Sequence, residues 1–156
     1  LPICGAAWGP GGRTLISASS DTTLRLWQSE RWTQITVLRG HSRAVNCVAW
    51  GPGGATIASG STDNTIRLWQ GADGFASGVL YGHTDAVLAL TWSPDGSLLA
   101  SGGMDCTLRI WRVADSTLLY MREAHKRPII SLAWSPDGHL LASAGADRSI
   151  KLWKIT

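Results

Sequence analysis

The chain has 156 residues, of which 14 are Lys or Arg and 11 are Asp or Glu, and 44% are hydrophobic. This size and composition predict one globular unit and exclude a disordered chain, because a single core can organise about this many residues. The sequence also combines 18 Gly with nine Trp, which indicates a chain that turns often and buries large aromatic rings.

Membrane and secretory classes are disfavoured. No apolar run approaches the roughly 18 residues that a membrane span needs, and residues 1–5 lack the basic and apolar regions of a secretory signal. The three cysteines, Cys4, Cys47 and Cys106, form no Cys-x-x-Cys pair, so neither a disulfide framework nor a four-ligand zinc site is predicted. We expect a cytoplasmic or nuclear protein with no membrane contact, no cofactor and no bound metal.

Short β-prone runs separated by turn residues follow one another along the chain. Residues 77–81, 87–92, 98–102 and 107–111 are such runs, and their length and composition are typical of strands rather than helices. The turn at residues 94–96 reads Pro-Asp-Gly, in which Pro fixes φ and Gly accepts a positive φ. Successive runs therefore predict antiparallel hairpins.

A repeat of 42 residues extends through the whole chain without drift. Eight of the nine Trp keep this spacing, as do a Ser, an Asp and, in three copies, a His. The periodic residues are Trp8, Trp50, Trp92 and Trp134; Trp27, Trp69, Trp111 and Trp153; Ser17, Ser59, Ser101 and Ser143; Asp21, Asp63, Asp105 and Asp147; and His41, His83 and His125. A fixed period of this length indicates a repeat architecture in which each copy is one supersecondary unit.

These residues resemble the WD-repeat β-propeller family, whose repeats of about 40 to 45 residues carry Gly-His near the start and Trp-Asp at the end. Gly40-His41 and Gly82-His83 match, whereas the third copy has Ala124-His125, and no copy has Asp after its final Trp. The resemblance implies an all-β propeller segment of four blades, each a four-stranded antiparallel sheet. The expected blades cover about residues 1–38, 39–80, 81–122 and 123–156.

The resemblance also implies a buried hydrogen-bond network in each blade, in which His links Asp to Ser and Ser accepts from Trp. The three expected sets are His41, Ser59, Asp63 and Trp69; His83, Ser101, Asp105 and Trp111; and His125, Ser143, Asp147 and Trp153. The first copy has Trp27, Ser17 and Asp21 without a His, so we expect its network to be incomplete.

The same residue types suggest a hydrolase, with Ser59 as nucleophile, His41 as base and Asp63 as orienting group. The combination occurs three times, however, and each Ser has a Trp at fixed spacing that can engage its hydroxyl. Repetition favours a structural role over an active site, which would occur once. We therefore expect a protein that is not an enzyme.

Partner specificity should come from loop positions that differ between blades. In the family, the turn after the His and the turn that carries the Asp open onto one face, which commonly binds peptides or protein surfaces. The candidate contact residues on that face are Arg43, Thr62, Asp85, Met104, Lys126 and Arg127. Trp32, the one Trp outside the repeat, is a further candidate, although it could instead fold back onto its own blade.

The remaining charges argue against nucleic acid as the partner. The only local basic cluster is Arg122, Lys126 and Arg127, and Glu123 interrupts it, whereas a nucleic-acid binder needs a basic stripe. We expect a scaffold or adaptor that binds other proteins within a complex. Two alternatives stay open: a regulatory propeller attached to an enzyme or ATPase in a longer chain, and a nucleic-acid-associated subunit.

Counting strands predicts an incomplete last blade. From the first strand of blade 1 to the third strand of blade 4, expected at residues 149–153, the repeat supplies fifteen strands and leaves blade 4 without an outer strand. That third strand should have an open edge. Four blades are also fewer than the family normally closes into a ring, so we expect either further blades in a longer chain, which we favour, or a second copy.

Overall fold

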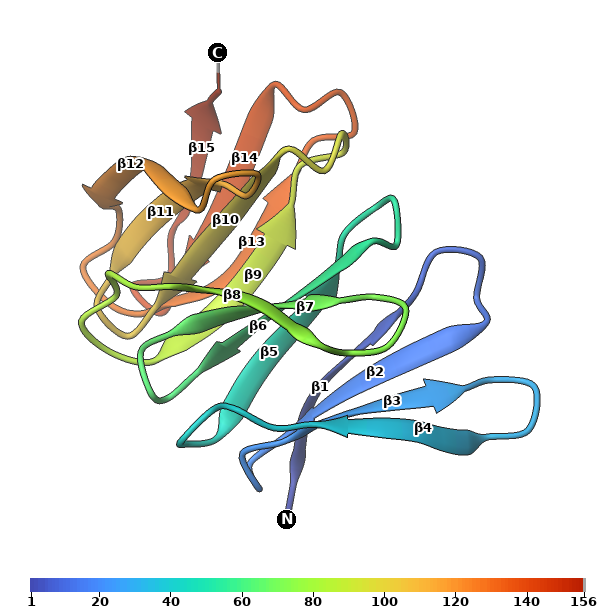
Figure 1. The fold of residues 1–156 in the computed structure, drawn as a ribbon. Coiled ribbons are helices and arrows are strands. Elements are labelled where there is room, and N and C mark those ends of the chain that lie inside the picture. Colours follow the sequence, from blue (N-terminus) through green and yellow to red (C-terminus); the bar gives the residue numbers. More distant parts are fainter. Residues whose placement is uncertain (156) are drawn as a thin grey trace.

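The computed structural model describes residues 1–155, which form fifteen β-strands and no helix (Figure 1). Within this described range, no segment is a helix long and apolar enough to cross a membrane. The strands form four separate antiparallel sheets, of four, four, four and three strands. The sheets follow one another along the chain as blades 1 to 4. The expected end of blade 4, at residue 156, lies outside the described residues.

Blades 1 and 2 each consist of consecutive hairpins, with the strands in sequence order across the sheet. Blade 1 contains β1 (Ile3–Trp8), β2 (Thr14–Ser19), β3 (Leu24–Gln28) and β4 (Thr33–Leu38). Blade 2 contains β5 (Val45–Trp50), β6 (Thr56–Ser61), β7 (Ile66–Gln70) and β8 (Ala76–Leu80). The strand expected at residues 77–81 is thus present and begins one residue earlier.

Blades 3 and 4 repeat this order, but blade 4 has one strand fewer. Blade 3 contains β9 (Val87–Trp92), β10 (Leu98–Gly103), β11 (Thr107–Arg112) and β12 (Thr117–Glu123). Blade 4 contains β13 (Ile129–Trp134), β14 (Leu140–Gly145) and β15 (Ile150–Lys154). The predicted fold is confirmed: an all-β propeller segment with an incomplete last blade.

The blades stand side by side in an open arc, with the N- and C-terminal ends of the chain on opposite sides of Figure 1. Their first strands are neighbours along this arc, because β1 packs beside β5, β5 beside β9, and β9 beside β13. Two Trp indoles bond across these junctions: Trp92 Nε1 donates to the carbonyl of Ala49 at 3.2 Å, and Trp134 Nε1 donates to that of Thr91 at 3.3 Å.

The core is divided into three clusters, one at each junction between blades. Each blade contributes its forward face, the side toward the next blade, and the next blade contributes its rear face. The first cluster joins Leu24 and Leu26 to Val45, Ile57 and Trp69. The second joins Ile66 and Leu68 to Val87, Leu99 and Trp111, and the third joins Leu108 and Ile110 to Ile129 and Leu141. A single blade therefore cannot bury its own apolar residues, as expected for repeat proteins.

Strand β15 is the open edge that the strand count predicts. It pairs with β14 on one side, and among the described residues it is the last strand of its sheet. The expected strand at residues 149–153 forms one residue later, because Ser149 remains in the turn and bonds to Asp147. A hollow of about 610 Å³ between β12 and β15 is lined by Leu119, Tyr120 and Trp153, at the side of blade 4 where an outer strand would lie.

Candidate functional site

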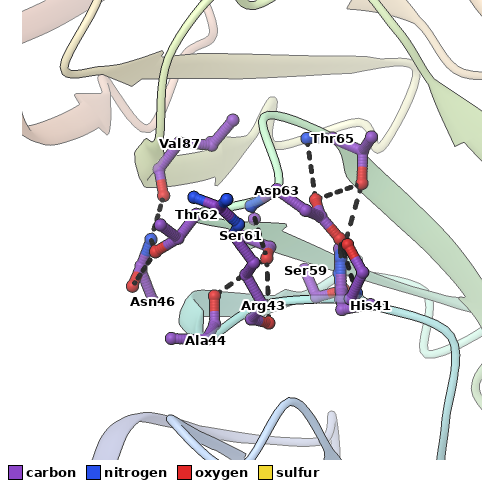
Figure 2. Close-up of polar contacts among 12 residues, drawn as sticks. His41, Arg43, Ala44, Asn46, Ser59, Ser61, Thr62, Asp63, Thr65 and Val87 are labelled. Atoms are coloured by element: carbon purple, nitrogen blue, oxygen red, sulfur yellow. Dashed lines mark hydrogen bonds and ion pairs between the residues drawn. The ribbon is translucent and has the colours of Figure 1, made fainter.

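Four side chains of blade 2 form a continuous polar chain, and Figure 2 shows three of them, His41, Ser59 and Asp63. Nδ1 of His41 lies 2.8 Å from Asp63 Oδ2, and Nε2 lies 2.8 Å from Ser59 Oγ. Trp69 Nε1 donates to the same Ser59 Oγ at 2.9 Å. If Nδ1 of His41 carries the proton and donates to the carboxylate, Nε2 accepts from the Ser59 hydroxyl, and every group has a partner.

Blades 3 and 4 repeat this arrangement. In blade 3, His83 lies 2.8 Å from both Asp105 and the Ser101 hydroxyl, which accepts from Trp111 at 2.8 Å. In blade 4, His125 lies 3.1 Å from Asp147 and 2.8 Å from the Ser143 hydroxyl, which accepts from Trp153 at 2.9 Å. The structure thus brings together all three sets chosen from the repeat. In blade 1, Trp27 still donates to Ser17 at 2.9 Å, and Asp21 instead bonds Thr23 and Arg25.

The networks keep their acids ionised. Burial by itself would raise the pKa of Asp63, but hydrogen bonds from the Thr65 hydroxyl, His41 and two backbone amides outweigh this and lower the pKa to about 2. Burial lowers the pKa of His41, and the hydrogen bond to Asp63 offsets this only in part. A neutral imidazole beside a carboxylate is the resulting state at neutral pH.

The buried position of these groups opposes a hydrolase. Ser59 is 0% exposed and His41 is 5% exposed, so a substrate carbonyl cannot reach the hydroxyl without displacing the blade. The indole of Trp69 also occupies a lone pair of the Ser59 oxygen that a nucleophile would need free. The geometry therefore supports an orienting role for these residues.

Three of the four periodic Asp, in blades 2 to 4, each tie two turns together. The backbone amide of Ser42, directly after His41, donates to Asp63 Oδ2 at 3.0 Å, and the same bond joins Thr84 to Asp105 and Lys126 to Asp147, at 3.1 and 3.0 Å. The turn after the His and the turn that carries the Asp are thus held at one end of the strands, as the family resemblance implies. We call this surface the loop face.

The departure from Gly-His in blade 4 has a packing explanation. A Cβ on Gly40 would meet Arg67 Nη1 at 2.8 Å, and a Cβ on Gly82 would meet Arg109 Nη1 at 2.6 Å, so a guanidinium lies over both glycines. Where the repeat has Ala124 instead, it also has Lys151, whose Nζ donates to the Ala124 carbonyl at 2.6 Å. The thinner lysine side chain leaves room for the alanine methyl.

Five of the candidate contact residues lie exposed on the loop face: Arg43, Asp85, Met104, Lys126 and Arg127. Thr62 is half-buried, and its hydroxyl exchanges hydrogen bonds with Asn46 (Figure 2), so it is less available to a partner. Trp32 is not part of this group. It lies in the β3–β4 turn, at the opposite end of the strands, where it is 64% exposed and sits edge-on to Trp8 with ring centroids 6.0 Å apart.

A family model described as the IFT122 first β-propeller matches residues 2–156. The chain belongs to this family. No curated protein matches it. The matched region spans all four blades, so the WD-repeat resemblance seen in the sequence and the propeller architecture agree over the whole chain.

One exposed cation on the loop face of this IFT122-type propeller was not among the residues chosen from the sequence. Arg148 follows Asp147 in the β14–β15 turn, the same turn that bonds the amide of Lys126. Its repeat equivalents are Thr22, Asn64 and Cys106. Comparing charge at this repeat position would have found it. Lys126, Arg127 and Arg148 together give blade 4 the most basic part of the loop face.

Cys47 and Cys106 lie in surroundings that disfavour the reactive thiolate. Burial raises the pKa of the Cys47 thiol to about 12, and burial together with nearby carboxylates raises that of Cys106. Both therefore stay protonated at neutral pH and are poor nucleophiles. Across residues 1–155, no three His, Cys, Asp or Glu side chains gather closely enough to hold a metal ion.

Proposed function

We propose that the chain is a non-catalytic protein-interaction module, which presents the loop face to a partner protein within a complex. Its membership in the IFT122 first-propeller family supports a role as a complex subunit. One structural observation carries the proposal: most of the side chains that vary between blades on this face are exposed, whereas the repeated ones form hydrogen bonds within the internal networks.

The charges indicate which partner segment would fit. Lys126, Arg127 and Arg148 are exposed around two turns that Asp147 holds together, and the apolar Met104, 45% exposed, lies in the corresponding turn of blade 3. Arg and Met are enriched in protein interfaces. The complementary ligand is an acidic peptide segment that also carries an apolar residue.

Selection from a displayed peptide library tests this function, with the immobilised chain as bait. Selected peptides should be acidic, and the double charge reversal K126E/R127E should weaken their binding at least tenfold, since the attraction turns into repulsion. Reversal of Arg31, an exposed residue in the β3–β4 turn at the other end of the strands, is the matched control and should leave binding unchanged. Equal loss in both variants, or selection of peptides without acidic residues, would contradict the proposal.

A further inference from the structure

Two turns of blade 3 are fixed side by side on the loop face. Asp85 lies in the connection between β8 and β9, and Met104 lies in the β10–β11 turn. The backbone amide of Met104 donates to the carbonyl of Ala86, the residue after Asp85, at 2.8 Å. Both Asp85 and Met104 are exposed. A carboxylate and an apolar thioether therefore occupy neighbouring positions on hydrogen-bonded backbone.

The same β10–β11 turn is bonded to the start of blade 4. The carbonyl of Cys106 accepts from the amides of Ala124 and His125, at 3.0 and 3.4 Å. The next two residues along the chain are Lys126 and Arg127, and both are exposed. The loop face thus has a fixed order of chemical character from blade 3 to blade 4: acidic, then apolar, then basic.

Asp85 reverses the charge that other blades carry at its repeat position. The equivalent residues are Arg43 in blade 2 and Arg127 in blade 4. The carboxylate of Asp85 accepts from the adjacent Ala86 amide at 2.7 Å, and it forms no ion pair within residues 1–155. Its charge is therefore available to a cation of a partner.

Other carboxylates reinforce the negative end of this order. Glu123, at the end of β12, is also exposed. Burial raises the pKa of the Cys106 thiol, and the nearby carboxylates of Asp105, Glu123, Asp147 and Asp85 raise it further. A surface with this negative potential attracts cations and repels anions. A uniformly acidic ligand would therefore be repelled where it passes from the basic turns of blade 4 onto blade 3.

Given the peptide-binding function proposed for the loop face, on which this inference rests, we propose that the partner segment carries a basic residue, an apolar residue and an acidic run in this order. The basic residue pairs with Asp85, and the apolar residue contacts Met104. The acidic run pairs with Lys126 and Arg127. Asp85 is thus the residue that determines specificity, because it selects acidic segments that also carry a cation and rejects uniformly acidic ones.

Peptides selected from a displayed library on the immobilised wild-type chain supply the probe. They should carry Lys or Arg on one side of an apolar residue and Asp or Glu on the other. The tightest binder is then synthesised in two forms, one unchanged and one with its basic residue replaced by Glu. Fluorescence polarisation of the labelled peptides measures each Kd. The replacement should weaken binding to the wild-type chain about tenfold, since an attraction becomes a repulsion.

Asp85→Lys should reverse this preference. It should bind the unchanged peptide about tenfold more weakly than the wild-type chain does, and the Glu-containing peptide about tenfold more tightly. Asp85→Asn keeps an acceptor for the Ala86 amide and removes the charge, so it should bind the two peptides with similar Kd values. Rescue of the Glu-containing peptide by Asp85→Lys distinguishes charge recognition from a structural role, because a damaged turn would weaken both peptides.

Glu30→Lys is the matched control. Glu30 is an exposed acid in the β3–β4 turn, at the opposite end of the strands, so this variant should bind both peptides as the wild-type chain does. Matching circular dichroism spectra and melting temperatures show that the variants are folded. Selected peptides whose binding K126E/R127E leaves unchanged would contradict the loop-face function and the role of Asp85 together. Peptides that K126E/R127E weakens but that carry no basic residue, or an Asp85→Lys variant that weakens both peptides alike, would overturn the role of Asp85 alone.

Discussion

At the scale of single residues, the serine hydroxyl is the centre of each network because it satisfies two partners at once. Ser59 accepts from Trp69 and donates to His41, so its loss would leave two buried groups without a partner. Ser17 in blade 1 serves Trp27 alone. The chain therefore allows a serine with one side-chain partner, Ser17, to be compared with a serine that has two, Ser59.

We expect Ser59→Ala to lower the free energy of unfolding by about 1 to 3 kcal/mol, because an unpaired buried polar group retains its desolvation penalty. Ser101→Ala and Ser143→Ala should behave alike. Ser17→Ala should have a smaller effect, since one bond is lost and Trp27 is half-buried. Urea denaturation monitored by circular dichroism measures all four. A loss for Ser17→Ala as large as that for Ser59→Ala would show that the histidine contributes little.

Acid should destabilise the chain through these same residues. In the folded state the pKa of His41 lies below its ordinary 6.5, so the stability that it contributes is present above that pH and is lost as the pH falls through it. The pKa of Asp63 is about 2 rather than 3.8, so its contribution is present above about 4 and is lost as the pH falls toward 2.

Both contributions have the same sign, so the urea midpoint should fall continuously from pH 7 to pH 3. Asp63→Asn removes the carboxylate that titrates in the lower part of this window. Its midpoint should start lower at pH 7 and change less between pH 4.5 and pH 3 than that of the wild-type chain. A midpoint that stays constant down to pH 4 would contradict the assignment of a neutral buried His41.

At the scale of strands and turns, the sequence predicted most strand positions, because each repeat position occurs in four copies that can be compared with one another. Alternation and turn residues placed the strands within one residue, as at β8 and β15. The fixed spacing of 42 residues also brought His, Ser, Asp and Trp together correctly, since equal spacing in equal blades produces equal geometry.

The backbone conformation of the turn that carries the periodic Asp could not be predicted from the sequence. The residue after the periodic Asp has a positive φ in all four blades, at Thr22, Asn64, Cys106 and Arg148, with φ between 64° and 75°. No Gly occupies this position, and Asn64 alone is a residue that favours the left-handed region. In each of these turns the backbone amide of the second residue after the Asp donates to the Asp carboxylate, as Thr23 donates to Asp21, and this bond stabilises the conformation.

A reciprocal exchange tests this strain. Thr22 is β-branched and stands at φ 75°, whereas Asn64 stands at φ 70° in the equivalent turn. Thr22→Asn should therefore raise the free energy of unfolding by up to about 1 kcal/mol, and Asn64→Thr should lower it by about 1 to 2 kcal/mol. Thermal denaturation of the two variants checks both signs together. Two changes in the same direction would show that side-chain contacts, and not φ, decide the preference.

At the scale of the whole molecule, stability resides in the junctions rather than in the blades. Each of the three apolar clusters takes residues from two consecutive blades, so a blade depends on its neighbours, as in other repeat proteins. The same logic explains why the ends of the arc expose Ile3 and Ile150, whose repeat equivalents are buried. Sequence periodicity alone could not reveal this difference, because the residues at the ends and in the middle are chemically alike.

Two isoleucines at the same repeat position show how much burial in a junction contributes to the free energy of unfolding. Ile66 is 0% exposed between blades 2 and 3, and Ile150 is 75% exposed on blade 4. Ile66→Ala should lower the free energy of unfolding by about 2 to 5 kcal/mol, through lost burial and the cavity left behind. Ile150→Ala should change it by less than about 0.5 kcal/mol, because this side chain already contacts solvent. Urea denaturation measures both, and comparable losses would contradict the difference in burial between the two side chains.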